Sequence, residues 1–328
     1  MAKDEIFGPF IDWYLNLIEK DFSVELTPQT IKEKEFVNAV WAIDPYEQKM
    51  APHKSTLKVI ARLLGGGFSK VHPIYVCPKS DQGLGEARNQ MQNFMMFLDL
   101  GDTEPFHVYS EPSSDRSERV EKVLNIAHEH NAKVVLLTSH GRSSLGATFL
   151  GSFARDLLNK SDIPIIFINP HTSSYVVSDK VMFATDFSEQ SKVAFQEFLN
   201  LVRGKTSEII LCHVLSFPYE YVDAYGMSMP LLNYYREDQK EWAEREAQRW
   251  IKEAEGKDIN IRLNNIMEES LSAPAHSIKA IAEREKVALI GLVSHVGPIE
   301  KLVIGSVTRD LMSSQKFNLW VCGPRFGS

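Results

Sequence analysis

The sequence predicts an α/β protein that consists of two tandem domains, each built on a five-stranded parallel sheet. Two observations predict this fold class. Short apolar runs, which suit buried strands, alternate with longer amphipathic runs along nearly the whole chain. The alternation ends near residue 170 and then restarts in the same order. Such alternation is typical of parallel sheets that are covered by helices on both faces.

The first half alternates five strands with four helices. Its apolar runs VVLL and PIIFI are typical of central strands, which are buried on both faces. Its first helix should end at the glycines that begin with Gly65, because glycine readily adopts the left-handed backbone that closes a helix. We expect strands at 37–44, 72–77, 105–110, 132–139 and 163–169, and helices at 55–64, 85–100, 115–131 and 152–161.

The second half repeats this plan with a longer middle part, which contains a long helix around Trp242 and Trp250. The two halves are joined by a short polar segment, so we expect them to be tightly connected. We expect strands at 178–186, 207–214, 259–266, 287–294 and 317–323, and helices at 188–203, 229–256, 272–286 and 306–315.

The first 33 residues stand apart from the repeat. Five apolar side chains recur there at helical spacing: Phe10, Trp13, Tyr14, Leu17 and Ile18. They predict a short amphipathic helix, which either packs on the body of the protein or binds a partner. We therefore divide the chain into an N-terminal extension at 1–33, a first domain at 34–170 and a second domain at 178–325.

Composition excludes several classes of partner and location. The net charge of −7 argues against a nucleic-acid-binding surface. Three cysteines are too few for a disulfide framework and fit a reducing compartment. The sequence has no run of 18 apolar residues, and its first residues lack the pattern of a secretory signal. We therefore expect a cytoplasmic protein that binds neither nucleic acid nor membrane.

Candidate binding residues stand at the carboxyl ends of the strands, where open parallel sheets bind their ligands. Asp44 and Asp186 end the first strand of each half. Each carboxylate either accepts hydrogen bonds from a ribose or an adenine, or caps the following helix. The second strands end at Val76 and Cys77 and at Val214. Backbone groups there either read an adenine edge or belong to the core.

A glycine-containing loop follows the fourth strand of the first half. Gly141 can adopt positive φ and bring the backbone close to a ligand. Gly151 and Ser152 open the next helix, where exposed N–H groups and the helix dipole favour phosphate. The loop matches neither the P-loop pattern nor the dinucleotide-binding GxGxxG pattern. The residues alone therefore leave a phosphate site and a simple turn both open.

Over residues 35–325 the sequence resembles a tandem member of the universal stress protein family. The family signature is Gly, two residues, Gly, nine residues, then Gly with Ser or Thr. Gly141, Gly151 and Ser152 match it, whereas Thr138 replaces the first glycine. The resemblance implies a Rossmann-like fold and ATP, with or without Mg²⁺, in the first half. It carries over the following residues: Asp44, Val76, Cys77, Ser139, His140, Gly141, Gly151, Ser152 and Phe153.

The second half matches the family signature less well. Val296 stands where the first half has Gly141, and a β-branched residue disfavours positive φ. The resemblance therefore implies a poorer nucleotide site there, with the residues Asp186, Val214, Gly305 and Ser306. Because family members pair through their last strands, it also implies that 163–169 and 317–323 form an internal pseudo-dimer, and it leaves a homodimer open.

The sequence names no catalytic residues. None of the ten histidines has the spacing of a metal site, and no nucleophile with an adjacent base can be identified. Two functions stay open. One is a stress-response protein regulated by ATP binding, with slow incidental ATP hydrolysis undecided. The other is a nucleotide-independent stress adaptor, whose clefts bind another small molecule or a protein partner.

Overall fold

The computed structural model describes the following residues: 36–46, 52–77, 83–111, 115–138, 151–169, 178–215, 229–254, 260–266, 274–294, 305–314 and 316–327. The chain divides into two compact units, Met1–Glu35 and Phe36–Ser328. The helix expected within residues 1–33 lies outside the described residues. Everything below concerns the second unit.

Strands and helices alternate through both halves, as the sequence predicts. In the first half they are β1 (Ala39–Ala42), α2 (Lys54–Leu63), β2 (Val71–Cys77), α3 (Leu84–Leu98), β3 (His107–Ser110), α4 (Arg116–Glu129), β4 (Val134–Thr138), α5 (Ser152–Lys160) and β5 (Ile165–Ile168). In the second half they are β6 (Lys180–Ala184), α6 (Glu189–Val202), β7 (Glu208–Val214), α8 (Met229–Ala254), β8 (Asn260–Ile266), α9 (Pro274–Arg284), β9 (Leu289–Val293), α10 (Ser306–Ser313) and β10 (Asn318–Cys322).

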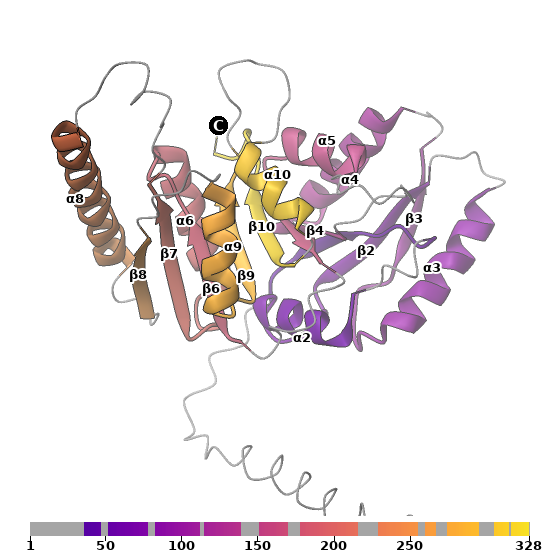
Figure 1. Cartoon of the computed structure of the whole chain (residues 1–328). Coiled ribbons are helices and arrows are strands. Elements are labelled where there is room, and N and C mark those ends of the chain that lie inside the picture. The colour runs from indigo at the N-terminus through magenta and orange to yellow at the C-terminus, as the bar shows by residue number, and fades with distance from the viewer. Residues whose placement is uncertain are drawn as a thin grey trace, which may run out of the picture. The chain divides into compact units, whose positions relative to one another are not determined.

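All the strands join one ten-stranded sheet in the order β3-β2-β1-β4-β5-β10-β9-β6-β7-β8, with β8 and β3 at its two ends (Figure 1). Neighbouring strands within each half are parallel. At the centre β5 and β10 run antiparallel, and Ile166 is paired with Trp320. Both halves therefore have the same strand order, and the predicted fold class and the internal pairing through the last strands are confirmed.

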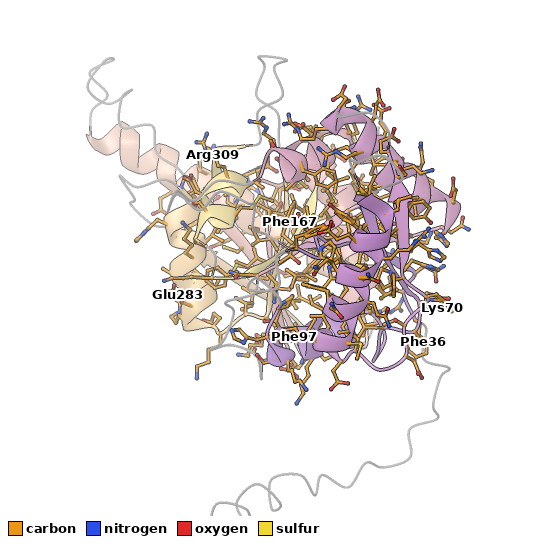
Figure 2. All side chains as sticks on the ribbon, turned by 90° about the vertical axis from the view of Figure 1, so that its right-hand side faces the viewer. Phe36, Lys70, Phe97, Phe167, Glu283 and Arg309 are labelled. Carbon is orange, nitrogen blue, oxygen red and sulfur yellow. The ribbon has the colours of Figure 1, made fainter. Side chains whose placement is uncertain are left out.

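Helices cover both faces of the sheet, and each face carries one apolar core that extends through both halves. The core that contains Trp41 and Trp320 lies under α2, α3, α6 and α8. The core that contains Val40 and Phe167 lies under α4, α5, α9 and α10; Phe167 is labelled near the middle of Figure 2. Because adjacent strand residues face opposite sides, Val40 and Trp41 enter different cores. The shared cores join the halves into a single three-layer body.

The first helix of the repeat ends as the sequence predicts. Gly65 and Gly66 have φ of 103° and 101°. The N–H of Gly66 donates to the carbonyl of Ala61 at 2.8 Å, and that of Gly65 to the carbonyl of Arg62 at 3.1 Å. This double closure needs a residue at positive φ, which explains why glycine occurs here.

Polar contacts near the connecting segment add to the strand pairing between the halves. Arg62 donates to the carbonyl of Ser178 at 2.9 Å. Lys205, in the second half, donates to the carbonyl of Leu63 at 3.0 Å. Leu63 is the last residue of α2, so the lysine satisfies a carbonyl that the helix itself leaves unpaired.

The three cysteines are free and buried: Cys77, Cys212 and Cys322. Burial raises the pKa of the Cys212 thiol to about 12, and it raises the pKa of Cys322 well above its ordinary value. Among the residues that the structure describes, no helix combines the length and apolar character needed to cross a bilayer.

Candidate functional site

Each half has a point where the strand order reverses direction. The chain passes from β1 to β2 on one side and from β4 to β5 on the other, so β1 and β4 flank this point. In the second half the corresponding pair is β6 and β9. A crevice outside the carboxyl ends of such strands is the usual ligand position in open α/β sheets. The structure therefore places the ends of the first and fourth strands side by side. In the sequence analysis these two positions are separate candidates for a binding site.

Asp44 lies two residues beyond β1, at the carboxyl end of that strand. Its Oδ1 accepts the backbone N–H of Tyr46 at 3.2 Å. The residue that caps α2 is His53, so the alternative in which Asp44 is a helix cap is wrong. The carboxylate instead organises the turn that leaves the sheet.

Asp186 is the counterpart in the second half. Its Oδ1 accepts the backbone N–H of Ser188 at 3.0 Å and the hydroxyl of Ser191 at 2.7 Å. Ser188 caps α6, so Asp186 is not the cap either. Between them Phe187 has φ of 59°, a strained conformation for a residue with a bulky side chain. Several contacts thus fix the orientation of this carboxylate.

The second strand ends in the buried Val76 and Cys77 in the first half and in the half-buried Val214 in the second. Val76 and Cys77 in the first half belong to opposite faces of the sheet, and Val214 packs on the face that Val76 shares. The carbonyl of Cys77 accepts the N–H of Glu111 at 2.9 Å, so that group is already engaged. Their side chains belong to the core, and the expected backbone contacts to an adenine stay a prediction.

The helices that follow the fourth strands begin alike in both halves. Gly151 precedes α5 with φ of −54° and ψ of 145°, and Gly305 precedes α10 with φ of −52° and ψ of 145°. A glycine cap has no side chain to accept the N–H groups of the first turn, so these donors are left for another partner. Ser152 is exposed and Phe153 half-buried at the start of α5. Ser306 holds the corresponding first position of α10.

The loop between the fourth strand and the next helix is described only at its ends. Thr138 is half-buried and ends β4, where it pairs with Ile168. In the second half the buried Ser294 accepts the N–H of Gly305 through its hydroxyl oxygen at 3.4 Å, which closes the base of the loop. Ser139, His140, Gly141 and Val296 lie outside the described residues, so their expected roles stay predictions.

The sequence did not predict a cluster of three aromatic rings near the carboxyl end of β7. The rings of Phe187, His213 and Trp242 lie 5.0 to 6.0 Å apart, centroid to centroid. The Nδ1 of His213 donates to the carbonyl of Thr185 at 2.8 Å, and burial lowers the pKa of the imidazole. Strand register shows that Tyr75 occupies the same position in the first half. Aligning the two halves strand by strand could have revealed this difference.

Comparison with known families agrees with this double arrangement. The family model for "Universal stress protein family" matches twice, at residues 107–169 and 178–323, well over half of the chain. The chain belongs to the universal stress protein family. The two matches confirm the tandem repeat, whereas the expected domain boundaries at 34–170 and 178–325 stay predictions. No curated protein matches the sequence.

Solved structures of universal stress proteins share this fold. One from Archaeoglobus fulgidus is 18% identical, with a TM-score of 0.55, and covers 88% of this chain and 98% of its own. A functionally unknown protein, PA1789 from Pseudomonas aeruginosa PAO1, is 10% identical at TM-score 0.51, with coverages of 88% and 93%. A universal stress protein in complex with cAMP is 15% identical at TM-score 0.31 and covers 44% of this chain and 95% of its own. That score is too low to bear on the ligand of this protein.

Proposed function

We propose that the first half binds ATP, with or without Mg²⁺, as a regulatory ligand of a stress-response protein. The observation that carries the proposal is the glycine cap Gly151 at the start of α5, which follows β4, the strand next to β1 and Asp44. The backbone N–H groups and the dipole of a helix start attract phosphate. A carboxylate beyond the neighbouring strand is suited to accept hydrogen bonds from ribose hydroxyls.

The second half is proposed to bind ATP poorly or to hold a different ligand. Gly305 and Ser306 keep the helix start, and Asp186 keeps the carboxylate. The surroundings differ, however. His213 replaces Tyr75, and Phe187 replaces Pro45 next to the acid. These differences support an unequal pair of sites.

Calorimetric titration with ATP tests the proposal. Wild-type protein should bind ATP at millimolar concentration or below, and a thermal shift should accompany binding because a ligand stabilises the folded state that it binds. If neither heat nor a thermal shift appears at millimolar ATP, the first half is not an ATP site.

Matched glycine substitutions separate the two halves. The backbone angles of Gly151 and Gly305 are open to any residue, so valine should cause little backbone strain at either position. Gly151→Val should weaken ATP binding about tenfold or more by crowding the phosphate, a loss of about 1.4 kcal/mol. Gly305→Val should have little effect on ATP. Equal losses would mean that the two sites are wrongly ranked.

A nucleotide-independent adaptor is the second candidate function. Thr138 favours it, because its half-buried side chain stands at the end of β4 where the family signature has glycine. Native mass spectrometry of the purified protein distinguishes the two. Co-purified nucleotide would contradict the adaptor function. If the protein is nucleotide-free, and the Thr138→Gly variant gains no affinity for ATP in a titration, the adaptor function is supported.

We also propose a cytoplasmic location. The three thiols are free and buried, a state that a reducing compartment preserves. Localisation of the tagged protein by fractionation tests this point, and recovery in an oxidising compartment would contradict it.

A further inference from the structure

Histidines gather at the edge of the first half where its strands begin, opposite to the edge with the candidate ATP site. His72 lies near the start of β2, and His130 follows the last residue of α4. Their rings stack with centroids 3.9 Å apart and planes inclined by 31°. His107, the first residue of β3, belongs to the electrostatic surroundings of His72.

Most of the groups that act on the charge of His72 disfavour its protonated form. His130 faces it from the end of α4, and His107 from β3. Lys70, in the turn just before β2, is labelled in Figure 2. Glu104, just before β3, is the acid whose charge favours protonated His72. On β1 the residue paired with His72 is the uncharged Val40.

The end of α4 is held by apolar packing of Ile126 and Ala127, and the turn after it by two hydrogen bonds to Asn38, just before β1. The side-chain amide of Asn38 donates to the carbonyl of His130 at 3.4 Å, and the N–H of Lys133 donates to the carbonyl of Asn38 at 2.8 Å. The chain turns sharply between them, since Asn131 has φ of 51°. A force that separates the two imidazoles would therefore act directly on the end of α4.

We propose that the His72–His130 stack is an acid-sensitive contact, which holds the end of α4 on β2 at neutral pH and releases it in acid. Neutral imidazoles stack as flat, partly apolar rings. Two imidazolium rings at the same distance repel each other, and the charge of Lys70 adds to the repulsion.

The direction of the pH effect follows from the surroundings of His72. Burial, followed by the neighbouring His130, lowers the pKa of His72 below its ordinary value of about 6.5. Its contact therefore stabilises the fold fully above about pH 6.5 and weakens as the pH falls from that value toward the lowered pKa. The released segment should be the end of α4 and the turn after it, residues 126–133.

Hydrogen exchange of the full-length protein at pH 7.5 and pH 5.5 tests the proposal. Exchange rates are first corrected for the intrinsic effect of pH. The protection factors of residues 126–133 should then fall about tenfold more at pH 5.5 than those of α3, which serves as the internal reference; we call this difference the excess loss. In His72→Gln this excess loss should vanish. An equal loss in wild type and His72→Gln would overturn the proposal.

His128→Gln is the matched control. His128 lies on the same helix end but pairs with Asp162 at 3.0 Å instead of joining the stack. Its substitution should leave the excess loss of protection intact. If it removes that loss as completely as His72→Gln does, the pH response belongs to the His128–Asp162 pair and the proposal is wrong.

Histidine NMR signals of the wild-type protein provide a test that needs no variant. The ring protons of His72 should titrate over the same pH range in which residues 126–133 lose protection. Titration of His72 without any change in the exchange of this segment would also overturn the proposal.

Discussion

Asn318 and Asn169 connect the two halves across the central strand pair: the side-chain oxygen of Asn318 accepts the backbone N–H of Asn169 at 2.9 Å. The amide nitrogen of Asn318 donates to the carbonyl of Ala288 at 3.3 Å. Both asparagines are buried. One side chain thus ties the end of β5 to the starts of β9 and β10, a position where the register of the antiparallel pair is set.

Asn318→Leu should destabilise the protein by about 1–3 kcal/mol, because the buried N–H of Asn169 loses its acceptor. Urea unfolding measures the change. Asn200→Leu, at an exposed position of α6, is the control and should change the free energy of unfolding by less than about 0.5 kcal/mol. A similar loss of unfolding free energy in both variants would show that the hydrogen bond from Asn169 to Asn318 does not stabilise the protein.

Gly323→Ala should also destabilise the protein, by about 1–3 kcal/mol or more, since a Cβ there would lie 2.0 Å from the carbonyl oxygen of Leu158. The obstacle is the backbone of α5, which cannot simply move aside. At Gly85, in the first turn of α3, a Cβ meets no atom within 4 Å. Gly85→Ala should therefore stabilise by up to about 1 kcal/mol. Thermal unfolding measures the stability of both variants. A stabilised Gly323→Ala variant together with a destabilised Gly85→Ala variant would contradict this prediction.

Stability should fall in mild acid because of His213. Its pKa is lowered, first by burial, so the unfolded state binds a proton more readily than the folded state does. The stabilising contribution is complete above about pH 6.5 and is lost as the pH falls below that value. His213→Tyr copies the residue at the equivalent position of the first half. In urea unfolding it should reduce the pH dependence between 7.5 and 5.5, and an unchanged dependence would contradict this account.

The three thiols should resist modification while the protein is folded. All are buried, and the pKa of Cys212 is raised to about 12, so its reactive thiolate is scarce at pH 8. A colorimetric thiol reagent should label none of them within minutes in the native state and all three in denaturant. Rapid labelling of one thiol in the native protein would show that its surroundings open.

The alternation of elements could be predicted from the sequence, because apolar runs of strand length and amphipathic runs of helix length are local signals. The helix end at Gly65 was predictable for the same reason. The roles of Asp44 and Asp186 were not. Aspartate at such a position suits a helix cap, but in the fold His53 and Ser188 take that place. The hydrogen bonds that each carboxylate makes instead depend on the path of the chain after the strand, which the sequence does not reveal.

Contacts between residues far apart in the chain could not be predicted from the sequence. The stack of His72 on His130 and the ring group around His213 depend on which strands become neighbours and on their register. The internal strand pairing itself was expected only because the sequence resembles a family whose members pair in this way. The family signature pointed to Gly151 and Gly305, and both begin helices with the same backbone angles.

The antiparallel pairing of β5 with β10 has a consequence for how the two sites can change over evolutionary time. In a symmetric dimer of identical subunits, every substitution appears in both crevices at once. Here both copies belong to one polypeptide, so each crevice mutates independently and the pair stays together at any dilution. Tyr75 against His213, and Pro45 against Phe187, are differences of this kind, which a symmetric dimer of identical chains could not carry.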